Sequence, residues 1–186
     1  EDVLVPVFHK FGKYKRVSAA PFRHIPYNEA MERYGSDKPD LRIDLEIQDI
    51  SDLVQGCGFG PFEGNVVKAV AVSGYAGSRK QIDKLCADAE VQSGNKAYWF
   101  RVDEKGEIVG GIAKFVQPTA EQVKAGLGIA PNTLVLLASG TKGAAQKTAG
   151  VLIKLAGAAC PEHMDLEKYE FCWIVDFPMY EIGEES

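Results

Sequence analysis

The side chains that could do acid–base chemistry are few and lie far apart along this sequence. Asp176 and Glu181 flank the tetrapeptide FPMY, and Asp176 follows an apolar run in which burial of an unpaired carboxylate would be costly. A carboxylate that faces solvent or accepts backbone hydrogen bonds at the end of a strand is nevertheless the favoured interpretation. His9, His24 and His163 lie in separate connecting segments, where a histidine is usually just solvated.

Sequence motifs with a known chemistry are missing. The chain contains no GxxxxGK[ST], no GxGxxG after a predicted strand, no HExxH and no GxSxG. The glycine-rich run GCGFGPFEG precedes a predicted strand instead of opening a helix, which argues against a phosphate loop. The cysteines are single and lack metal-site spacing, so we expect buried free thiols at Cys57, Cys86, Cys160 and Cys172. We therefore assign no catalytic, cofactor-binding or metal-binding residue.

Two groups of residues could contact nucleic acid. Arg79 and Lys80 lie at the start of a predicted helix, where free N–H groups and a partial positive charge suit a phosphate. The alternative, that both are merely solvated, is favoured because the surrounding sequence is acidic. Trp99, Phe100 and Arg101 could form a stacking surface for bases, although such a cluster is more often half-buried strand packing.

The composition is that of an ordinary globular protein. The 186 residues are 46% hydrophobic and 25% charged, enough for one domain with flanking pieces or for two small domains. No apolar run is long enough to cross a bilayer and the N-terminus lacks a signal-peptide layout, so we expect a cytoplasmic protein. Because the chain begins EDVLVPVF without a methionine, we expect it to be a piece of a longer protein.

The charge is unevenly distributed. The net charge of −5 argues against a general polyanion binder. Residues 1–42 carry eight Lys and Arg against six Asp and Glu, whereas residues 43–186 carry 13 against 20. The basic character therefore lies in the N-terminal segment, in which residues 13–26 form a basic connector bounded by prolines.

Hydrophobic periodicity, caps and glycine breaks predict the order of elements. We expect helices within residues 27–34, 44–58, 79–94, 119–128 and 141–160. We expect strands within residues 66–74, 132–140 and 171–181, and a hairpin within residues 96–112. Residues 2–12 fit a helix or a strand, and RYGSDKPDLR at 33–42 is a loop. Ser78, Thr119 and Thr141 are the expected N-caps, with Gln122 completing a capping box after Thr119. Because strands and helices alternate but include a hairpin, the pattern predicts an α+β fold, a two-layer sheet with helices packed on one face.

Two stretches carry a family resemblance. YNEAMERYGSDKPDLR at residues 27–42 and WIVDFPMYE at 173–181 resemble bacterial-type aspartyl-tRNA synthetases of class II, on either side of a large insertion in their catalytic domain. The residues between resemble more loosely the inserted, DCoH-like α+β module called the GAD domain, best in GSRKQIDKL at 77–85 and GGIAKFV at 110–116. The basic segment at residues 10–24 does not match the family pattern.

The resemblance implies a domain division and a function for the parent protein. Residues 1–42 would be a flanking segment of the catalytic domain, residues 43–170 would be the GAD-type insertion, and residues 171–186 would be a returning strand of the catalytic domain. The parent, expected to be a homodimer, would use ATP and Mg²⁺ to activate aspartate and would charge tRNA(Asp), or also tRNA(Asn). The residues of the family that handle ATP, Mg²⁺ or aspartate have no counterpart here, so the fragment would be inactive. The module would support the positioning of the tRNA acceptor arm.

Two other functions stay open at this point. The chain could be a binding module of a tRNA-dependent amidotransferase, whose GAD domain would lack the two flanking motifs. It could also be a free-standing domain that binds a small molecule, which only the architecture supports.

Overall fold

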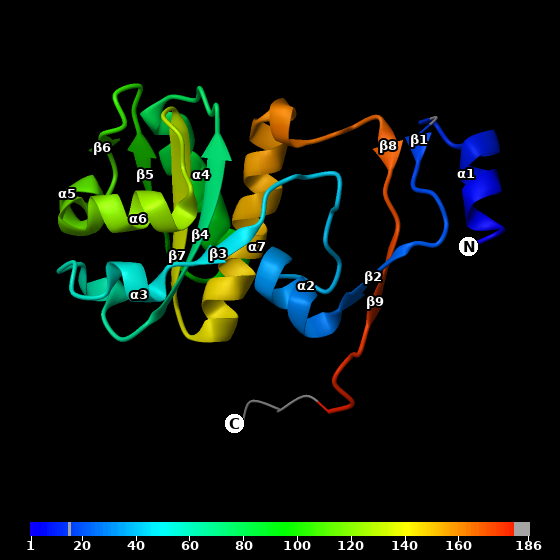
Figure 1. Ribbon diagram of the computed structural model, residues 1–186, viewed down its shortest axis with the longest axis horizontal. Helices are drawn as coiled ribbons and strands as arrows, with labels where there is room; N and C mark the ends of the chain where they lie inside the picture. The colour runs from blue at the N-terminus through cyan, green and yellow to red at the C-terminus, as the bar shows by residue number, and fades with distance from the viewer. Residues whose placement is uncertain (15, 181–186) are drawn as a thin grey trace.

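The centre of the fold is a five-stranded sheet in which every neighbouring pair of strands is antiparallel (Figure 1). The computed structural model describes residues 1–14 and 16–180. The strand order is β3 (Ile47–Asp49), β4 (Val66–Ser73), β7 (Thr133–Gly140), β5 (Ala97–Val102) and β6 (Ile108–Val109). The predicted α+β class is confirmed.

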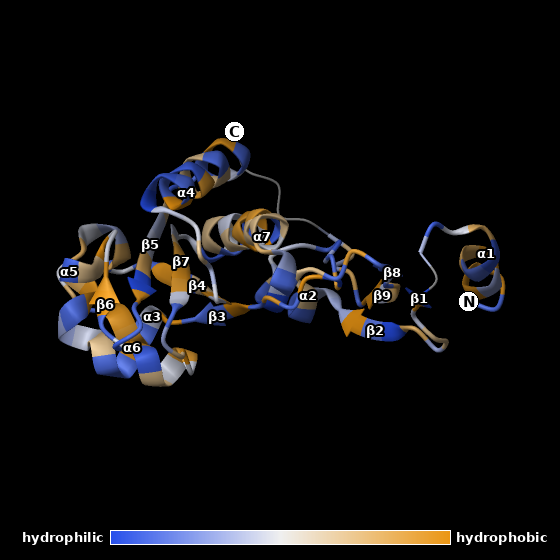
Figure 2. Ribbon diagram, turned by 90° about the horizontal axis from the view of Figure 1, so that it is seen from above, coloured by the Kyte–Doolittle hydropathy of each residue, from blue (hydrophilic) through white to orange (hydrophobic). Residues whose placement is uncertain are grey.

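Helices cover both faces of this sheet, so the prediction of helices on one face is wrong (Figure 2). One face carries the long helices α4 (Arg79–Ser93) and α7 (Lys142–Ala159). The opposite face carries the short helices α3 (Ser51–Val54), α5 (Ala113–Val116) and α6 (Ala120–Leu127). We call the sheet with these five helices, residues 47–159, the central module.

The burial of β7 on both faces bears on the wrong prediction that helices cover only one face. Along β7, Leu134 and Leu136 face the long helices, whereas Val135 and Leu137 face the short ones, and all four are fully buried. A strand that is buried on both faces reads as a continuous apolar run, so this run indicates that both faces are covered, although it does not say what covers the second face. Two of the three helices in that layer have only four residues, too few to show a period.

Helix starts follow the predicted caps in two of three cases. The Ser78 hydroxyl accepts a hydrogen bond from the backbone N–H of Gln81, whose side chain accepts one from the backbone of Ser78, and together they form a capping box. Thr141 caps α7 by accepting from Ala144 N–H. Thr119 does not cap α6, because the 3₁₀ turn η2 (Gln117–Thr119) leads straight into that helix and its hydroxyl donates to Val116 instead.

The predicted helix at residues 44–58 is largely wrong. Residues 47–49 form the edge strand β3 beside β4, and only the short helix α3 follows. The apolar residues Ile47, Ile50 and Val54 fit helical spacing, but Ile47 and Ile50 pack into different cores on opposite faces of the sheet. Tertiary pairing therefore overrides the local pattern here.

The remaining elements form a smaller flanking part. It consists of α1 (Leu4–Phe11), β1 (Arg16–Val17), β2 (Arg23–Pro26), α2 (Tyr27–Tyr34), β8 (Lys168–Tyr169) and β9 (Cys172–Val175). β1 pairs with β8 and β2 pairs with β9, both in parallel. The strand that the sequence predicts within residues 171–181 is thus observed as β9.

The chain passes between the two parts at one place. Ile43 and Met164 form an isolated antiparallel bridge. Asp165 N–H donates to the Arg42 carbonyl at 2.9 Å, and Asp44 N–H donates to the His163 carbonyl at 3.1 Å. The two crossings therefore lie side by side. Among the described residues, no helix combines the length and the apolar character needed to cross a membrane.

Candidate functional site

Arg79 and Lys80 occupy the first turn of α4, as the sequence predicts. Both are exposed, and Arg79 lies 3.6 Å from Asp83, one turn further along the helix. Lys80 forms no ion pair with a described residue. Along the rest of α4, Lys84 pairs with Asp88 on an exposed face. Positive charge is thus present at the helix start, but carboxylates on the same helix lie close behind it.

The loop between β4 and α4, residues 74–77, separates two cavities. One, of about 600 Å³, lies between this loop, α4 and the end of α7, and the other, of about 720 Å³, lies beside Arg101 and the β5–β6 turn. Arg101 donates hydrogen bonds to the carbonyls of Tyr75 and Gly77, which pins the loop. In the larger cavity Arg101, Lys105, Asp103 and Glu104 mix opposite charges, so neither sign of ligand is favoured.

The possible stacking surface on β5 does not exist. Trp99 is 7% exposed and its indole N–H donates to Asp83 at 2.9 Å, while Phe100 is fully buried in the opposite core. Successive residues of a strand point to opposite faces, so these two rings cannot form one platform. Strand packing, the more common alternative, is the observed arrangement.

His163 is not a solvated connector residue, which corrects the sequence interpretation. Its Nδ1 lies 2.6 Å from an Asp44 carboxylate oxygen and its Nε2 lies 2.9 Å from the Ser73 carbonyl and 3.3 Å from the Ser73 hydroxyl. This resembles a serine–histidine–aspartate arrangement. A carbonyl can only accept, however, so Nε2 carries its hydrogen and cannot take a proton from the hydroxyl. The contact holds the chain crossing in place and makes no nucleophile.

The other candidate acid–base groups stay apart. His9 and His24 are exposed, as expected. Asp176 is also exposed, with a positive φ of 57°, and Glu181 lies outside the described residues. All four cysteines are free, and burial raises the pKa of the Cys86 thiol to about 12. Such a thiol is protonated near neutral pH and is a poor nucleophile.

Possible metal-ligating side chains do not cluster in the described part of the chain. Within residues 1–14 and 16–180, no group of three or more His, Cys, Asp or Glu side chains could hold a metal ion. We derive no catalytic step from these residues.

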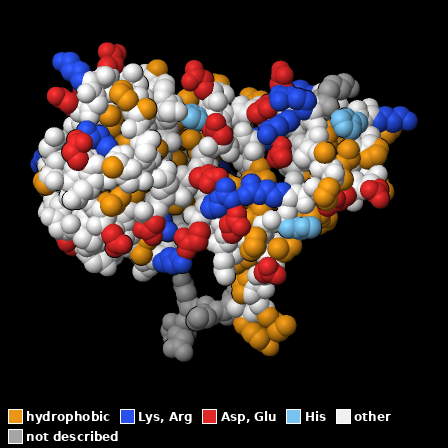
Figure 3. Space-filling view, in the orientation of Figure 1, with side chains coloured by type: hydrophobic (Ala, Val, Ile, Leu, Met, Phe, Trp, Pro, Cys, Tyr) orange, Lys and Arg blue, Asp and Glu red, His pale blue; other side chains and the backbone are white. Residues whose placement is uncertain are grey.

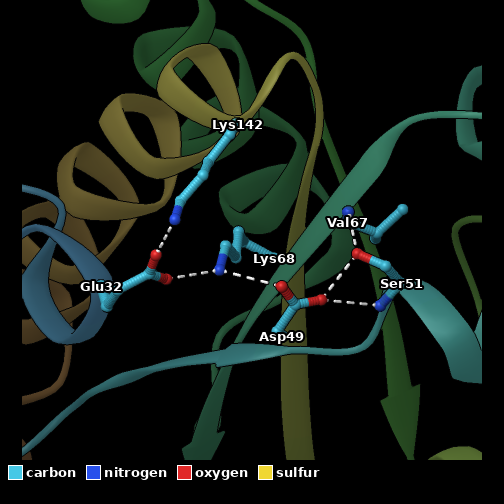
Figure 4. A network of polar contacts seen from close by, with 6 residues as sticks. All are labelled: Glu32, Asp49, Ser51, Val67, Lys68 and Lys142. Carbon is cyan, nitrogen blue, oxygen red and sulfur yellow. Dashed lines mark hydrogen bonds and ion pairs between the residues drawn. The ribbon is translucent and has the colours of Figure 1, made fainter.

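A network of ion pairs and hydrogen bonds lies where α2 meets the central module (Figure 4). Lys68, in the middle of β4, is 3% exposed, and its Nζ donates to Glu32 of α2 at 2.8 Å and to Asp49 of β3 at 3.0 Å. The second oxygen of Glu32 pairs with Lys142 at the start of α7. One carboxylate of the flanking part thus binds two lysines of the module.

The module side of this network is fixed by further hydrogen bonds. Asp49 lies directly opposite Lys68 in the β3–β4 ladder. Its other oxygen accepts from Ser51 N–H at 2.9 Å and from the Ser51 hydroxyl at 2.6 Å, and that hydroxyl in turn accepts from Val67 N–H at 2.9 Å. Asp49 is therefore held in one orientation, and it directs the Lys68 ammonium group toward α2.

The electrostatics of the network favour the charged forms of its members. Hydrogen bonds from Lys142 and then from Lys68 lower the pKa of Glu32 from 4.5 to about 2. Burial acts to lower the pKa of Lys68, but its bonds to Glu32 and Asp49 outweigh this and raise it. For Asp49 burial acts to raise the pKa, but the bonds from Ser51 and Lys68 together lower it. The network is therefore ionic at neutral pH.

A second contact between α2 and the module depends on glycine. α2 ends at Gly35, which has a left-handed φ of 63°. A Cβ atom at Gly35 would lie 2.1 Å from the Gln146 carbonyl oxygen, and one at Gly150 would lie 2.7 Å from the Tyr34 carbonyl oxygen. The backbones of α2 and α7 therefore approach so closely that neither position has room for a side chain.

The sequence interpretation missed this junction. The available signal was Lys68, the single charge inside the apolar run VVKAVAVSG. A buried lysine is rare unless it is paired, so its position in a two-sided strand indicates carboxylates nearby. Which carboxylates they are could not be read, because Glu32 is 36 residues away along the chain.

Exposed apolar side chains gather on the flanking part, around β9 and the segment that follows it (Figure 3). Trp173 is 45% exposed, and Phe177, Met179 and Tyr180 are more exposed still. A patch of this kind is typical of a surface that another protein segment covers.

The chain belongs to a family of aminoacyl-tRNA synthetases. The family described as class II tRNA synthetases (D, K and N) matches residues 1–185. The whole chain is 39% identical to an aspartate–tRNA ligase of Streptomyces coelicolor, of which it covers 32%. It is 38% identical to an aspartate–tRNA(Asp/Asn) ligase of Rickettsia bellii, again covering 32%, and 39% identical to one of Zymomonas mobilis. The chain spans about a third of the length of these curated relatives.

Proposed function

We propose that this chain is an internal part of an aspartate–tRNA ligase. The observation that carries the proposal is the similarity of the entire chain, both flanking motifs included, to about a third of such ligases. An amidotransferase module or a free-standing sensor domain would share the central fold but not the flanks. The parent would form aspartyl-adenylate from ATP and transfer aspartate to its tRNA.

Within the parent, we assign a supporting function to the GAD-type insertion, residues 43–170, which contains the central module. One feature supports the division into an insertion and its host: the paired crossing at Ile43 and Met164. ATP and Mg²⁺ would then be bound by parts of the parent outside this chain. The flanking segments 1–42 and 171–186 would belong to the catalytic domain. A homodimeric parent in the cytoplasm is proposed from the family resemblance.

The decisive experiment is aspartate-dependent pyrophosphate exchange with the full-length protein and, in parallel, with residues 1–186. We expect exchange by the full-length protein and none by the fragment, because adenylate formation needs preorganised charges around the phosphates. Exchange by the fragment would contradict the assignment. Charging of tRNA(Asp) and tRNA(Asn) transcripts by the full-length protein separates the two specificities that the names of its relatives carry.

Contact with tRNA is proposed at the start of α4. Arg79 and Lys80 are exposed there, and the helix N-terminus adds N–H donors. Replacing both by Glu in the full-length protein should raise the KM for tRNA and leave pyrophosphate exchange unchanged. The control is Lys96→Glu combined with Lys105→Glu, which reverses two exposed positive charges outside α4. An equal rise of KM in the control would indicate a general charge effect, and a loss of exchange would indicate misfolding.

A further inference from the structure

We propose that Lys68 is a positioning residue, which fixes the orientation of the central module relative to α2 and so sets how the parent presents the module to tRNA. The effect on tRNA rests on the proposed function. The effect on orientation does not, and it can be measured separately.

Two contacts join α2 to α7, and they differ in kind. The glycine contact at Gly35 and Gly150 brings two backbones together without an interlocking side chain. The ionic contact, where Glu32 meets Lys142, lies one turn before Gly35 on α2 and eight residues before Gly150 on α7. Eight helical residues span about 12 Å, so along α7 the two contacts are two turns apart. The glycine contact fixes how closely the two backbones approach, and the ionic contact adds a restraint on the orientation of α2.

Lys68 is the member of the ionic contact that gives it direction. Lys142 is 65% exposed and its side chain is flexible, so its ammonium group can pair with Glu32 from many positions. Lys68 is 3% exposed and extends from a central strand, and Asp49 already fixes one of its hydrogen bonds. Its ammonium group therefore offers α2 a donor at one defined point, and Glu32 reaches it only when α2 has one orientation.

The exposure of the two carboxylates indicates that Lys68 affects the orientation of α2 more than the free energy of unfolding. Glu32 is 40% exposed and Asp49 is 53% exposed, so water can solvate both carboxylates if Lys68 is removed. A methionine of similar length would fill the space of the lysine stem without leaving an uncompensated buried charge. Buried ion pairs of this kind contribute little net stability, and their best-attested effect is on structural specificity. Lys68→Met should therefore leave the protein folded while its two parts become less firmly oriented.

The test is a distance measurement in the full-length protein. Spin labels attached through non-natural amino acids at Asn28 of α2 and Val91 of α4, both exposed, report the spread of distances between the parts. We expect Lys68→Met to broaden the distance distribution, and Lys84→Met, which breaks a pair within α4, to leave it unchanged. A distribution as narrow as that of the wild type would overturn the proposal. Glu32→Gln, at a half-exposed position that cannot disrupt the core, must broaden it as well.

Steady-state kinetics test the second part of the proposal, the effect on tRNA. For Lys68→Met we expect the KM for tRNA to rise about 3- to 10-fold, with kcat and pyrophosphate exchange within about two-fold of wild type. A broadened distribution with an unchanged KM would show that orientation does not affect tRNA, and would overturn this half. If the wild-type protein showed no pyrophosphate exchange, the proposed function would fail while the distance result still decided the role of Lys68.

Discussion

The central module and the flanking part differ in how they bury their apolar side chains. The module closes two cores, one on each face of its sheet, around residues such as Leu136 and Phe100 that are fully buried. The flanking part has a core of only three buried residues, Ile25, Ala30 and Tyr34. Among the described residues, nine of the eleven exposed large apolar side chains lie outside the central module.

The two parts therefore differ in what they need in order to be stable. The module has the features of an independently stable unit, because its elements cover each other on both faces. The flanking part has strands paired only two at a time, and two-stranded pairs are marginal without further packing. Its exposed apolar surface agrees with the proposal that it contacts the rest of a catalytic domain.

The difference in burial can be tested by truncating a leucine side chain in each part. Leu136→Ala should lower the free energy of unfolding by about 3 kcal/mol, because it empties a fully buried site. Leu4→Ala in α1, at a residue that is 38% exposed, should cost about 0.5 kcal/mol or less. Urea unfolding of the 186-residue chain measures both. Equal losses of unfolding free energy would show that Leu4 is packed as tightly as Leu136, and would contradict the difference between the two parts.

The contact between the parts can be tested within one helix. Gly150→Ala should destabilise by about 1–3 kcal/mol, because its Cβ meets backbone atoms of Tyr34 and Gly35 that cannot rotate away. Gly143→Ala, in the first turn of the same helix with no atom within 4 Å of its Cβ, should stabilise by up to about 1 kcal/mol. The difference between the two variants isolates the contact from helix propensity. A Gly150→Ala variant as stable as Gly143→Ala would contradict the close approach.

The ionic contact predicts a pH dependence. The pKa of Glu32 in the folded state is about 2, below its ordinary value of 4.5, so the charged form stabilises the fold above pH 4.5. That contribution is lost as the pH falls toward 2. Glu32→Gln should cost about 1 kcal/mol at pH 7, a discounted value because solvent screens this 40% exposed group. The difference from wild type should shrink between pH 4.5 and 2.

A control variant decides whether this pH dependence is specific. Glu121 pairs with Lys124 within α6 and is 87% exposed, so Glu121→Gln should change stability by less than about 0.5 kcal/mol throughout the same range. Chemical denaturation at a series of pH values compares the two variants. A Glu32→Gln penalty that stays constant down to pH 2 would argue against the ionic network.

The smallest effect is expected on the module surface. Arg79→Glu combined with Lys80→Glu should change the free energy of unfolding by no more than about 0.5 kcal/mol, since both side chains are exposed and carboxylates are favourable at a helix start. Thermal unfolding checks this. A larger loss would mean that the pair supports the fold, and a change in tRNA binding could not then be read as a lost contact.

Local signals predicted the strands of the module and its long helices well. The apolar runs that form β4 and β7 end at glycines 74 and 140, the run that forms β5 ends before Asp103, and Ser78 and Thr141 cap the helices as expected. The errors concern information that is not local. The edge strand Ile47–Asp49 exists because β4 is beside it, and the second helical layer exists because β4 and β7 are buried on both sides.

The site was harder to predict than the fold. Arg79 and Lys80 were found because a helix start is a local feature, and their contact with tRNA stays a prediction. Lys68 and Glu32 could not be paired from the sequence, because strand register and helix packing bring them together. His163 was misjudged for the same reason, since its partners Asp44 and Ser73 lie 119 and 90 residues away.

The bridge between Ile43 and Met164 has a consequence for deletion variants. Directly opposed residues of an antiparallel pair have Cα atoms about 4.5–5.5 Å apart, and consecutive residues are about 3.8 Å apart. A linker of one or two residues could therefore replace everything between these positions without moving their neighbours. Closing so short a gap adds little to the chain entropy that a host domain loses when it folds. On the proposed domain division, deleting the residues between these two positions and joining the ends with such a linker should therefore leave the flanking part in place.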